Sequence, residues 1–289
     1  MKILLAGING QLGQELHPML VKLGDVTWVD RETLDLSQPD MIRQVIGEVK
    51  PDLIVNACAY TAVDKAESEP DLAMAVNGSG VGILAAEALK LGARLIHVST
   101  DYVFDGSQSH PYQETDPTNP IGVYGKSKLA GEEAIQQVGG DYIIVRTAWV
   151  YGVGGVGNFV KTMLRLGSSR DELRVVTDQV GSPTWTKDLA EVIVCMIQNS
   201  PESGIYHYTN SGVCSWYDFA IAIFEEAKAL GFPLQVQRVV PITTAEYPTP
   251  AKRPAYSVLS HRKISAVIGT HPPHWRQSLR LMLKDYQDN

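Results

Sequence analysis

Tyr124 and Lys128 stand four residues apart in the stretch NPIGVYGKSKLAGE. In a helix, residues i and i+4 lie on one face, so the phenol and the amine would point the same way. An ammonium group close to a phenol favours the phenolate, which predicts a tyrosine pKa lowered from about 10 toward neutrality. A tyrosine tuned in this way can act as the general acid for a carbonyl under reduction. A core tyrosine beside a solvated lysine is the plainer alternative.

A hydroxyl group is expected at the same place. The apolar run RLIHVS at 94–99 is typical of a buried parallel strand, and Thr100 follows it directly. The helix that carries Tyr124 should begin near Gly122, so its first turn would face the carboxyl end of this strand. We therefore predict a catalytic triad in which Thr100 orients the carbonyl oxygen and Tyr124 donates the proton. Lys128, the third member, would also reach the nicotinamide ribose.

A glycine-rich turn connects the first apolar run with the first helix. In AGINGQLGQEL the glycines are Gly7, Gly10 and Gly13, in a GxxGxxG spacing. Missing side chains allow a tight turn, a close approach of a pyrophosphate to the helix N-terminus, and packing of helix on strand. This position after strand one predicts dinucleotide binding, with a purely structural turn as the weaker alternative.

The residues after the second strand bear on the identity of the cofactor. Asp30 would accept hydrogen bonds from an adenosine ribose, which is typical of NAD. Arg31 could instead pair with the 2′-phosphate of NADP. NADPH and NADH both stay open, and two solvated charges in a surface turn are the alternative. Topology places four further positions near the cofactor: Asp35, Leu36, Ala57 and Ala59.

The elements that must position these residues alternate between strand and helix. Short apolar runs predict parallel strands at 2–6, 26–30, 52–57, 94–99 and 142–147. Helical patterns lie between them, at 38–49 and 70–91. This βαβ repetition predicts an α/β fold with a Rossmann-like, doubly wound parallel sheet.

The second half of the chain is less regular. Segments such as DQVGSPTW, YHYTNSG and PITTAEYPTPAKRP look loop-rich, with helices expected near 158–168, 186–199, 215–230 and 274–287. We predict an NAD(P)-binding domain over 1–150, completed by a segment near 178–205. Residues 151–289 would mainly form a smaller C-terminal α/β lobe that binds substrate over the carboxyl edge of the sheet.

Composition excludes several classes of partner. The 289 residues contain 25 Lys and Arg against 32 Asp and Glu, a net charge of −7, so nucleic acid and anionic membranes are unlikely partners. The N-terminus lacks the pattern of a signal peptide, and no uninterrupted apolar stretch approaches the about 18 residues of a membrane span. We expect a soluble cytoplasmic protein whose three cysteines are reduced.

Taken together, the motifs resemble a known family. GINGQLGQEL, NACAYTAVDKAESEP, VSTDYVFDG, VRTAWVYG and YPTPAKRPAYSVL are similar to the extended short-chain dehydrogenase/reductases. Within them the chain looks most like the dTDP-4-dehydrorhamnose reductases, over nearly its whole length. The resemblance implies hydride transfer from NADPH or NADH to C4 of dTDP-4-dehydro-L-rhamnose, which gives dTDP-L-rhamnose in dTDP-rhamnose biosynthesis.

The resemblance also carries roles onto individual positions. Together with the topology it assigns these residues to the cofactor: Gly7, Gly10, Gln11, Leu12, Gly13, Asp30, Arg31, Asp35, Leu36, Ala57, Ala59, Tyr124 and Lys128. It assigns these to the sugar nucleotide: Val63, Thr100, Asp101, Tyr102, Tyr124, Trp149, Asn158 and Arg253. Trp149 would offer an apolar wall to a deoxysugar, and Arg253 would bind the pyrophosphate. A core tryptophan and a solvated loop arginine are the alternatives.

One departure from the family concerns metal. Some members dimerise around Mg²⁺ held by glutamates, and Glu15 is present here, but Lys187 stands where another such glutamate would be. An ammonium group cannot ligate a cation. We therefore expect no bridging Mg²⁺ and a monomer or weak homodimer. His271 and His274, in HPPH, are interpreted as part of a surface turn and not as a metal site.

Two other functions compete with reduction. A nucleotide-sugar epimerase or 4,6-dehydratase would share the fold, but a dehydratase should show an acid pair after the strand-four threonine, and here Asp101 is followed by Tyr102. A non-catalytic dinucleotide-binding subunit, like the regulatory subunit of methionine adenosyltransferase, is the alternative from another class. The intact triad favours catalysis.

Overall fold

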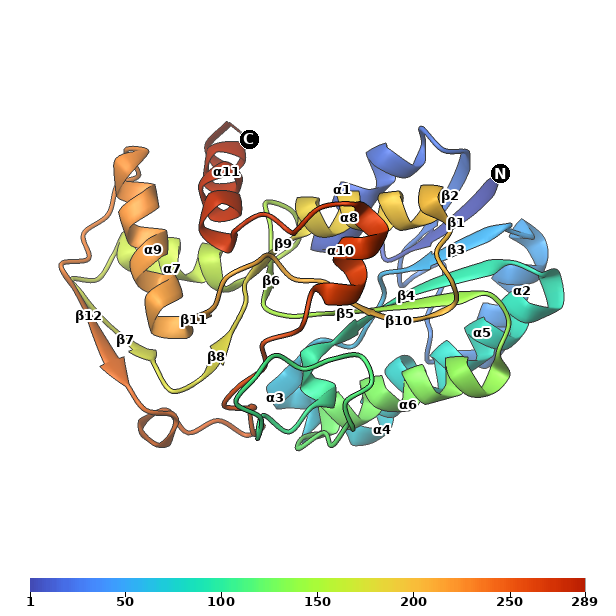
Figure 1. Cartoon of the computed structure of the whole chain (residues 1–289), viewed down its shortest axis with the longest axis horizontal. Coiled ribbons are helices and arrows are strands. Elements are labelled where there is room, and N and C mark those ends of the chain that lie inside the picture. The colour runs from blue at the N-terminus through green and yellow to red at the C-terminus, as the bar shows by residue number, and fades with distance from the viewer. Residues whose placement is uncertain (289) are drawn as a thin grey trace.

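A six-stranded parallel sheet lies at the centre of the larger lobe in the computed structural model, which describes residues 1–288 (Figure 1). The strands lie in the order β10-β5-β4-β3-β1-β2. Their bounds are Lys2–Ala6 (β1), Asp25–Val29 (β2), Leu53–Asn56 (β3), Arg94–Thr100 (β4), Tyr142–Thr147 (β5) and Gly204–His207 (β10). Each pair of neighbours is parallel. The five strands predicted from the apolar runs are confirmed to within a residue or so.

The sixth strand was not predicted. β10 lies in the segment around YHYTNSG, which was expected to be a loop, and that expectation was wrong. β10 is four residues long and forms an edge of the sheet, paired with β5 alone in the described chain. β3 is equally short but lies in a continuous apolar run, whereas the GIYH of β10 mixes a glycine and a histidine with two apolar residues and so lacks that signal. His207, at its end, is buried although it is polar.

Helices cover both faces of the sheet (Figure 1). On one face lie α1 (Gln11–Leu20), α8 (Thr186–Asn199) and α10 (Arg262–Ile268). On the other lie α2 (Pro39–Val49), α5 (Gly80–Leu91) and α6 (Val123–Val138). Fully buried residues such as Leu16 and Ile193 join the first layer to the sheet, as Leu84 and Ile135 join the second. The doubly wound α/β fold is thereby confirmed, whereas the domain boundary at residue 150 stays a prediction.

The helix predicted over 70–91 is interrupted. α4 (Pro70–Met74) passes into a π-helical turn (Ala75–Ser79) before α5 begins. By length and composition this run would qualify as a membrane span, a feature that the sequence analysis did not register. In the structure α5 packs between α2 and α6, so we assign the run to the interior of the α/β fold.

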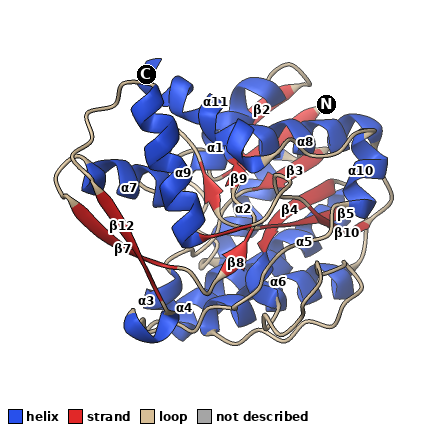
Figure 2. Cartoon of the chain, turned by 60° about the vertical axis from the view of Figure 1, so that its left-hand side comes forward, coloured by secondary structure: helices blue, strands red, loops and turns tan. Residues whose placement is uncertain are grey.

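The remaining elements form a smaller lobe beside the sheet. Its helices are α7 (Phe159–Gly167), α9 (Trp216–Ala229) and α11 (Trp275–Asp288). β7 (Glu172–Val176) pairs with β12 (Arg238–Ile242), and in Figure 2 this ribbon and α7 lie beside α9. Two-residue pairs join β6 (Val150–Tyr151) to β9 (Thr184–Trp185) and β8 (Val180–Gly181) to β11 (Cys214–Ser215). Two short helices, α3 (Val63–Ala66) and the 3₁₀ turn Asp101–Val103, belong instead to the larger lobe and lie against α6, and a second 3₁₀ turn spans Thr244–Glu246.

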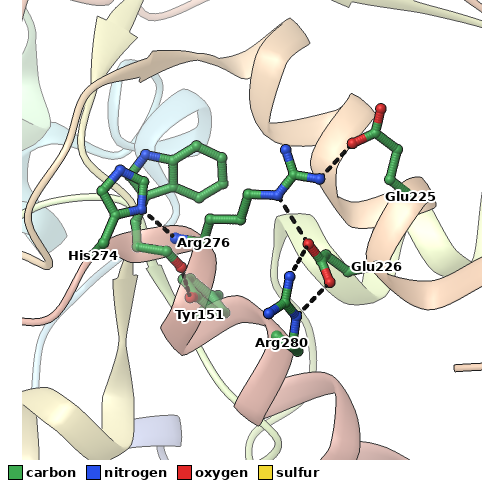
Figure 3. A network of polar contacts seen from close by, with 7 residues as sticks. Tyr151, Glu225, Glu226, His274, Arg276 and Arg280 are labelled. Atoms are coloured by element: carbon green, nitrogen blue, oxygen red, sulfur yellow. Dashed lines mark hydrogen bonds and ion pairs between the residues drawn. The ribbon is translucent and has the colours of Figure 1, made fainter. Parts of the chain in front are cut away.

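A charged network fastens α11 to α9 (Figure 3). Glu226 on α9 accepts hydrogen bonds from Arg276 Nε (2.9 Å) and Arg280 Nε (2.7 Å) on α11. The hydrogen bonds from Arg280 hold the pKa of Glu226 down at about 2. Nearby, the Tyr151 hydroxyl donates to the carbonyl oxygen of Trp275 at 3.4 Å. Tyr151 of β6 is thereby hydrogen-bonded to the first residue of α11.

Candidate active site

Two cavities meet at the carboxyl edge of the sheet. One, of about 260 Å³, is lined by the glycine turn and the ends of β2 and β3. The other, of about 600 Å³, reaches from the glycine turn to the end of β4 and the first turns of α6. Because both are lined by Asn9, Gly10, Ala57 and Ala59, they form neighbouring parts of one crevice. We name the first the nucleoside cavity and the second the reaction cavity.

The glycine turn has the geometry that a pyrophosphate site requires. Gly7 has a φ of +95°, a conformation that side chains rarely adopt, and its N–H donates to Val29 O at 2.9 Å. A Cβ on Gly13 would lie 2.1 Å from Gly7 O, so only glycine lets α1 pack this closely. Gly10 begins α1 without a side-chain cap, which leaves N–H groups of its first turn for an anion. Gly13 itself does not line the cavities.

Replacing Gly13 by alanine is expected to destabilise the fold and abolish tight dinucleotide binding, because the added methyl would meet backbone atoms. Overpacking of this kind costs about 1–3 kcal/mol in unfolding free energy. Gly47→Ala in α2 is the matched control: its Cβ meets nothing within 4 Å, and replacing a helical glycine by alanine stabilises by about 0.5–1 kcal/mol. Urea unfolding and a NADPH titration would measure both. Wild-type stability and affinity in Gly13→Ala would contradict this account of the turn.

The predicted adenosine contacts line the nucleoside cavity. Asp30 Oδ1 accepts hydrogen bonds from the N–H groups of Glu32 (3.0 Å) and Thr33 (3.1 Å), and the bond from Thr33 lowers the pKa of this exposed carboxyl. The Arg31 side chain is 76% exposed and lies 3.5 Å from Asp35 Oδ2. The ionised Asp30 can therefore accept from a ribose, and the exposed Arg31 guanidinium is open to a 2′-phosphate. Neither dinucleotide is excluded by these positions.

The three residues of the predicted triad line the reaction cavity together. Thr100 ends β4, and α6 begins one residue before Tyr124. The start of α6 is fixed by Glu67, whose Oε1 accepts the Val123 N–H at 2.8 Å. A Cβ on Gly125 would lie 2.2 Å from the carbonyl oxygen of Tyr102, so the helix rests directly on the turn after β4. This close packing places Tyr124 beside Thr100.

The predicted effect of Lys128 on Tyr124 was wrong for this structure. The pKa of Tyr124 is raised to about 12, chiefly by burial; a hydrogen bond with Thr100 opposes the rise, and the negative charge of Asp101 adds to it. The Lys128 amine lies elsewhere: Nζ donates to Val98 O at 2.7 Å and lies 3.1 Å from His97 Nε2. The phenol is therefore protonated at neutral pH, which is the form that a proton donor needs.

The ionisation of Lys128 is itself perturbed. Its side chain is buried, and burial lowers its pKa to about 8, although the carboxylate of Glu132 opposes this shift. Asp101 shows the complementary effect, because burial raises the pKa of its carboxyl to about 6. Perturbed ionisable groups in a cleft are typical of active sites, and here both line the same cavity as the phenol.

Four of the expected substrate contacts besides the triad also line the reaction cavity: Val63, Asp101, Tyr102 and Trp149. The rings of Tyr102 and Tyr124 meet edge to face at 5.4 Å. Trp149 has a φ of +47°, rare for a large side chain, and its indole stacks on Trp216 at 3.5 Å with a 5° tilt. The stacked pair makes a rigid apolar wall, as predicted for Trp149, while its contact with a sugar stays a prediction.

Two of the expected substrate contacts lie outside the cavity lining. Asn158 caps α7, accepting the Lys161 N–H at 3.0 Å, and its Nδ2 donates to Gln11 Oε1 and Gly152 O, both at 2.8 Å. Both its amide atoms are thus occupied by structural bonds.

Arg253 forms a bidentate ion pair with Asp64 of α3, at 2.8 and 3.1 Å. In the structure it therefore faces a carboxylate, and a phosphate would have to replace that partner.

The sequence analysis missed part of the lining. The loop over 155–157 borders the reaction cavity, and Val156 at its tip is fully exposed. The sequence did contain a signal for this loop, the glycine-rich run YGVGGVGN at 151–158, which begins two residues after Trp149. Lys161 Nζ ties the loop down by donating to Gly154 O (3.1 Å) and Gly155 O (3.0 Å). Asn9 and Thr61 are further lining residues that were given no role, although they lie within the motifs GINGQLGQEL and NACAYTAVDKAESEP.

Lys187 lies among carboxylates, as its position suggested. Its Nζ is 3.0 Å from Asp285 Oδ2. The pKa of Glu15 is raised because burial outweighs the opposing effect of the Lys187 charge. Among residues 1–288, no group of three or more His, Cys, Asp or Glu side chains is arranged to hold a metal ion. Lys187 places a positive charge among the acidic side chains of Asp285, Glu15 and Glu191.

Comparison with known proteins agrees with the geometry. The RmlD substrate binding domain model matches residues 1–288. A dTDP-4-dehydrorhamnose reductase of Burkholderia thailandensis is 45% identical over 99% of both chains, and the spore coat polysaccharide biosynthesis protein SpsK of Bacillus subtilis is 46% identical over 98% of this chain and 97% of its own. A crystal structure of dTDP-4-dehydrorhamnose reductase from Bacillus anthracis in complex with NADP has a TM-score of 0.92 and 39% identity, covering 98% of this chain and 99% of the other. The chain therefore belongs to the RmlD substrate binding domain family, the family of the dTDP-4-dehydrorhamnose reductases.

Proposed function

We propose that this protein reduces the C4 ketone of dTDP-4-dehydro-L-rhamnose to give dTDP-L-rhamnose, with NADPH or NADH as the reductant. The observation that carries the proposal is the reaction cavity, where Thr100, Tyr124 and Lys128 converge next to the glycine turn. Relatives of 41–46% identity over nearly the whole chain bear the reductase name. The protein would act in dTDP-rhamnose biosynthesis in the cytoplasm.

Different residues of the crevice would bind the cofactor, orient the ketone and donate the proton in such a reduction. A bound reduced nicotinamide supplies the hydride. The glycine turn and the start of α1 would hold the pyrophosphate of the dinucleotide, and Asp30 or Arg31 its adenosine end. Thr100 orients the ketone oxygen, and the phenol of Tyr124 gives that oxygen its proton as the hydride arrives at C4. One hydride and one proton convert the ketone to an alcohol, so the balance is complete.

A direct assay tests this proposal. Mixed with NADPH and enzymatically made dTDP-4-dehydro-L-rhamnose, the protein should oxidise the cofactor in proportion to the sugar consumed, followed by the absorbance of the reduced nicotinamide. An epimerase or a dehydratase would change the sugar without net loss of NADPH. A folded protein that binds NADPH but consumes none would be a regulatory dinucleotide-binding module, and the proposal would fail.

Arg253 is expected to exchange Asp64 for the diphosphate of the sugar nucleotide. Arg253→Ala should weaken dTDP binding by about 10- to 100-fold, since a hydrogen bond to a charged group contributes about 1.5–3 kcal/mol. Its effect on NADPH affinity should be small, because Arg253 lies outside the nucleoside cavity. Isothermal titration would measure both, with Arg174→Ala, a surface arginine paired with Glu246, as control. Unchanged dTDP affinity would remove Arg253 from the substrate site.

A monomer or weak homodimer that needs no Mg²⁺ is the expected assembly. The Lys187 ammonium beside Asp285 would repel a divalent cation there. Sedimentation velocity should give the same mass in millimolar Mg²⁺ and in EDTA. Lys187→Glu offers the matched comparison, because it restores a carboxylate at this place. A wild-type mass that rises on adding Mg²⁺ would contradict this prediction.

A further inference from the structure

The indole of Trp149, which lines the reaction cavity, is held by residues that do not line it. Its ring stacks on that of Trp216, the first residue of α9, with centroids 3.5 Å apart and planes 5° from parallel. Gly181 of β8 lies against the same indole, because a Cβ there would be 2.7 Å from Cε2 of the ring. Neither Trp216 nor Gly181 lines the nucleoside or the reaction cavity. We name the space between these two residues the indole slot.

Short paired strands build the indole slot. β8 pairs with β11, with Gly181 opposite Cys214, and α9 begins two residues after Cys214, at Trp216. Ser215 and Asp218 form a capping box at this start: Ser215 Oγ accepts the Asp218 N–H at 3.0 Å, and Asp218 Oδ2 accepts the Ser215 N–H at 2.9 Å. Trp216 therefore belongs to a helical turn whose position is fixed by both the strand pair and the cap.

The backbone of Trp149 is strained. Its φ of +47° is rare for a large side chain, and such a conformation persists only where the surrounding contacts impose it. Here the Trp149 carbonyl oxygen accepts the Thr184 N–H at 3.2 Å, and the indole slot holds the ring. Strain of this kind is concentrated at ligand-binding sites. It therefore points to a function for the direction in which this indole faces.

Trp216 also contacts a second element that borders the cavity. Its ring centroid lies 4.6 Å from that of Phe159, with the planes 50° apart. Phe159 begins α7, which follows the loop at 155–157 after a single residue. Trp216 is thus in contact with the chain on both sides of this loop, at positions 149 and 159.

We propose that Trp216 is a positioning residue of the sugar-nucleotide site, which together with Gly181 holds the Trp149 indole as a fixed wall for the deoxysugar ring. The proposal rests on the proposed function, in which the sugar occupies the reaction cavity. An indole that is already held in place needs no further ordering when the apolar side of a deoxysugar and its methyl group come to lie against it. The indole slot therefore contributes to the affinity for the sugar, and not to the affinity for the thymidine diphosphate.

Binding of the reaction product, in the presence of NADP⁺, tests the proposal without turnover. Isothermal titration gives the ratio of the dissociation constants of dTDP and dTDP-L-rhamnose, which measures what the sugar adds to binding. Trp216→Leu should lower this ratio by about 3- to 10-fold, the effect of losing one aromatic contact, while the affinity for dTDP is unchanged. Trp216→Phe keeps a flat ring in the slot and should stay within about twofold of the wild type. An unchanged ratio in Trp216→Leu would overturn the proposal.

Two further variants separate positioning from stability. Phe232→Leu removes a ring from the same apolar cluster, outside the cavity lining, so it should lower thermal stability and leave the ratio unchanged. In a Trp149→Ala background, Trp216→Leu should lower the ratio no further, because Trp216 acts through the indole that is then missing. A full additional loss in this double variant, or an equal loss in Phe232→Leu, would make Trp216 a structural residue and overturn the proposal.

Gly181→Ala changes the indole slot from its other side. The added methyl would meet the Trp149 indole at 2.7 Å, so the indole must move and the ratio should fall as in Trp216→Leu. If Trp216→Leu does not fold, this variant decides, and a wild-type ratio would overturn the proposal. Equal affinity of the wild type for dTDP and dTDP-L-rhamnose would also overturn it and leave the proposed function intact. A wild-type protein that binds dTDP-L-rhamnose not at all would instead refute the proposed function.

Discussion

Tyr124→Phe is expected to lower turnover by about 10²- to 10⁴-fold while dinucleotide affinity stays within a few-fold of the wild type. The substitution keeps the ring and its edge-to-face contact with Tyr102, and removes only the hydroxyl. Because burial raises the pKa of this phenol to about 12, the wild-type group is a protonated acid throughout the neutral range. Its loss therefore leaves the developing alkoxide without its donor.

The measurement for Tyr124→Phe separates chemistry from binding. Single-turnover oxidation of NADPH by the ketosugar gives the chemical step, and a fluorescence titration gives cofactor affinity. Tyr142→Phe, at the opposite end of the sheet at the start of β5, is the control and should behave as the wild type. Near-normal turnover in Tyr124→Phe would mean that the acid is assigned to the wrong residue.

Lys128→Met should impair both turnover and cofactor affinity. The amine lies in the wall of the reaction cavity and is expected to hold the nicotinamide ribose beside the phenol. Loss of a hydrogen bond from a charged or strongly polar group weakens binding by about 10- to 100-fold, on the basis of about 1.5–3 kcal/mol. Turnover should fall by at least about 10²-fold, because the ring to be oxidised is no longer fixed. Val98 O also loses its donor, so some stability is lost.

Lys126→Met is the matched control for Lys128. It lies on the same helix, two residues away, but its side chain is exposed to solvent. Steady-state kinetics at several NADPH concentrations, with thermal unfolding measured in parallel, separate the three effects. If Lys128→Met changed stability alone, the lysine would have a structural role, and its assignment to the cofactor would fail.

The architecture could be predicted because it rests on local patterns. Five parallel strands and the long helices are strongly periodic, and the rule that ligands bind at the carboxyl edge places Thr100, Tyr124 and Lys128 together. β10 was not predicted because its four residues, GIYH, do not form a continuous apolar run. The loop at 155–157 was not predicted to line the site, because its glycines alone do not indicate which cavity the loop borders.

Side-chain partners and charge states could not be predicted in the same way. The Lys128 amine lies against Val98 O and His97 instead of the Tyr124 hydroxyl, and burial then raises the pKa of that phenol. The sequence shows His97 only as part of a buried strand. The Asn158 amide donates a hydrogen bond to Gln11, which is 147 residues away in the chain. Arg253 is paired with Asp64, which is 189 residues away. Such partners are known only once the fold has brought them together.

The central claim is that a hydride enters C4 of the sugar while Tyr124 supplies the proton on its oxygen. Reaction with NADPH that carries deuterium on the transferred position of the nicotinamide ring tests it most directly. The account predicts one deuterium at C4 of dTDP-L-rhamnose, located by proton NMR, with one NADP⁺ formed for each sugar reduced. Solvent hydrogen at C4, deuterium at another carbon, or a changed sugar without NADP⁺ would contradict it.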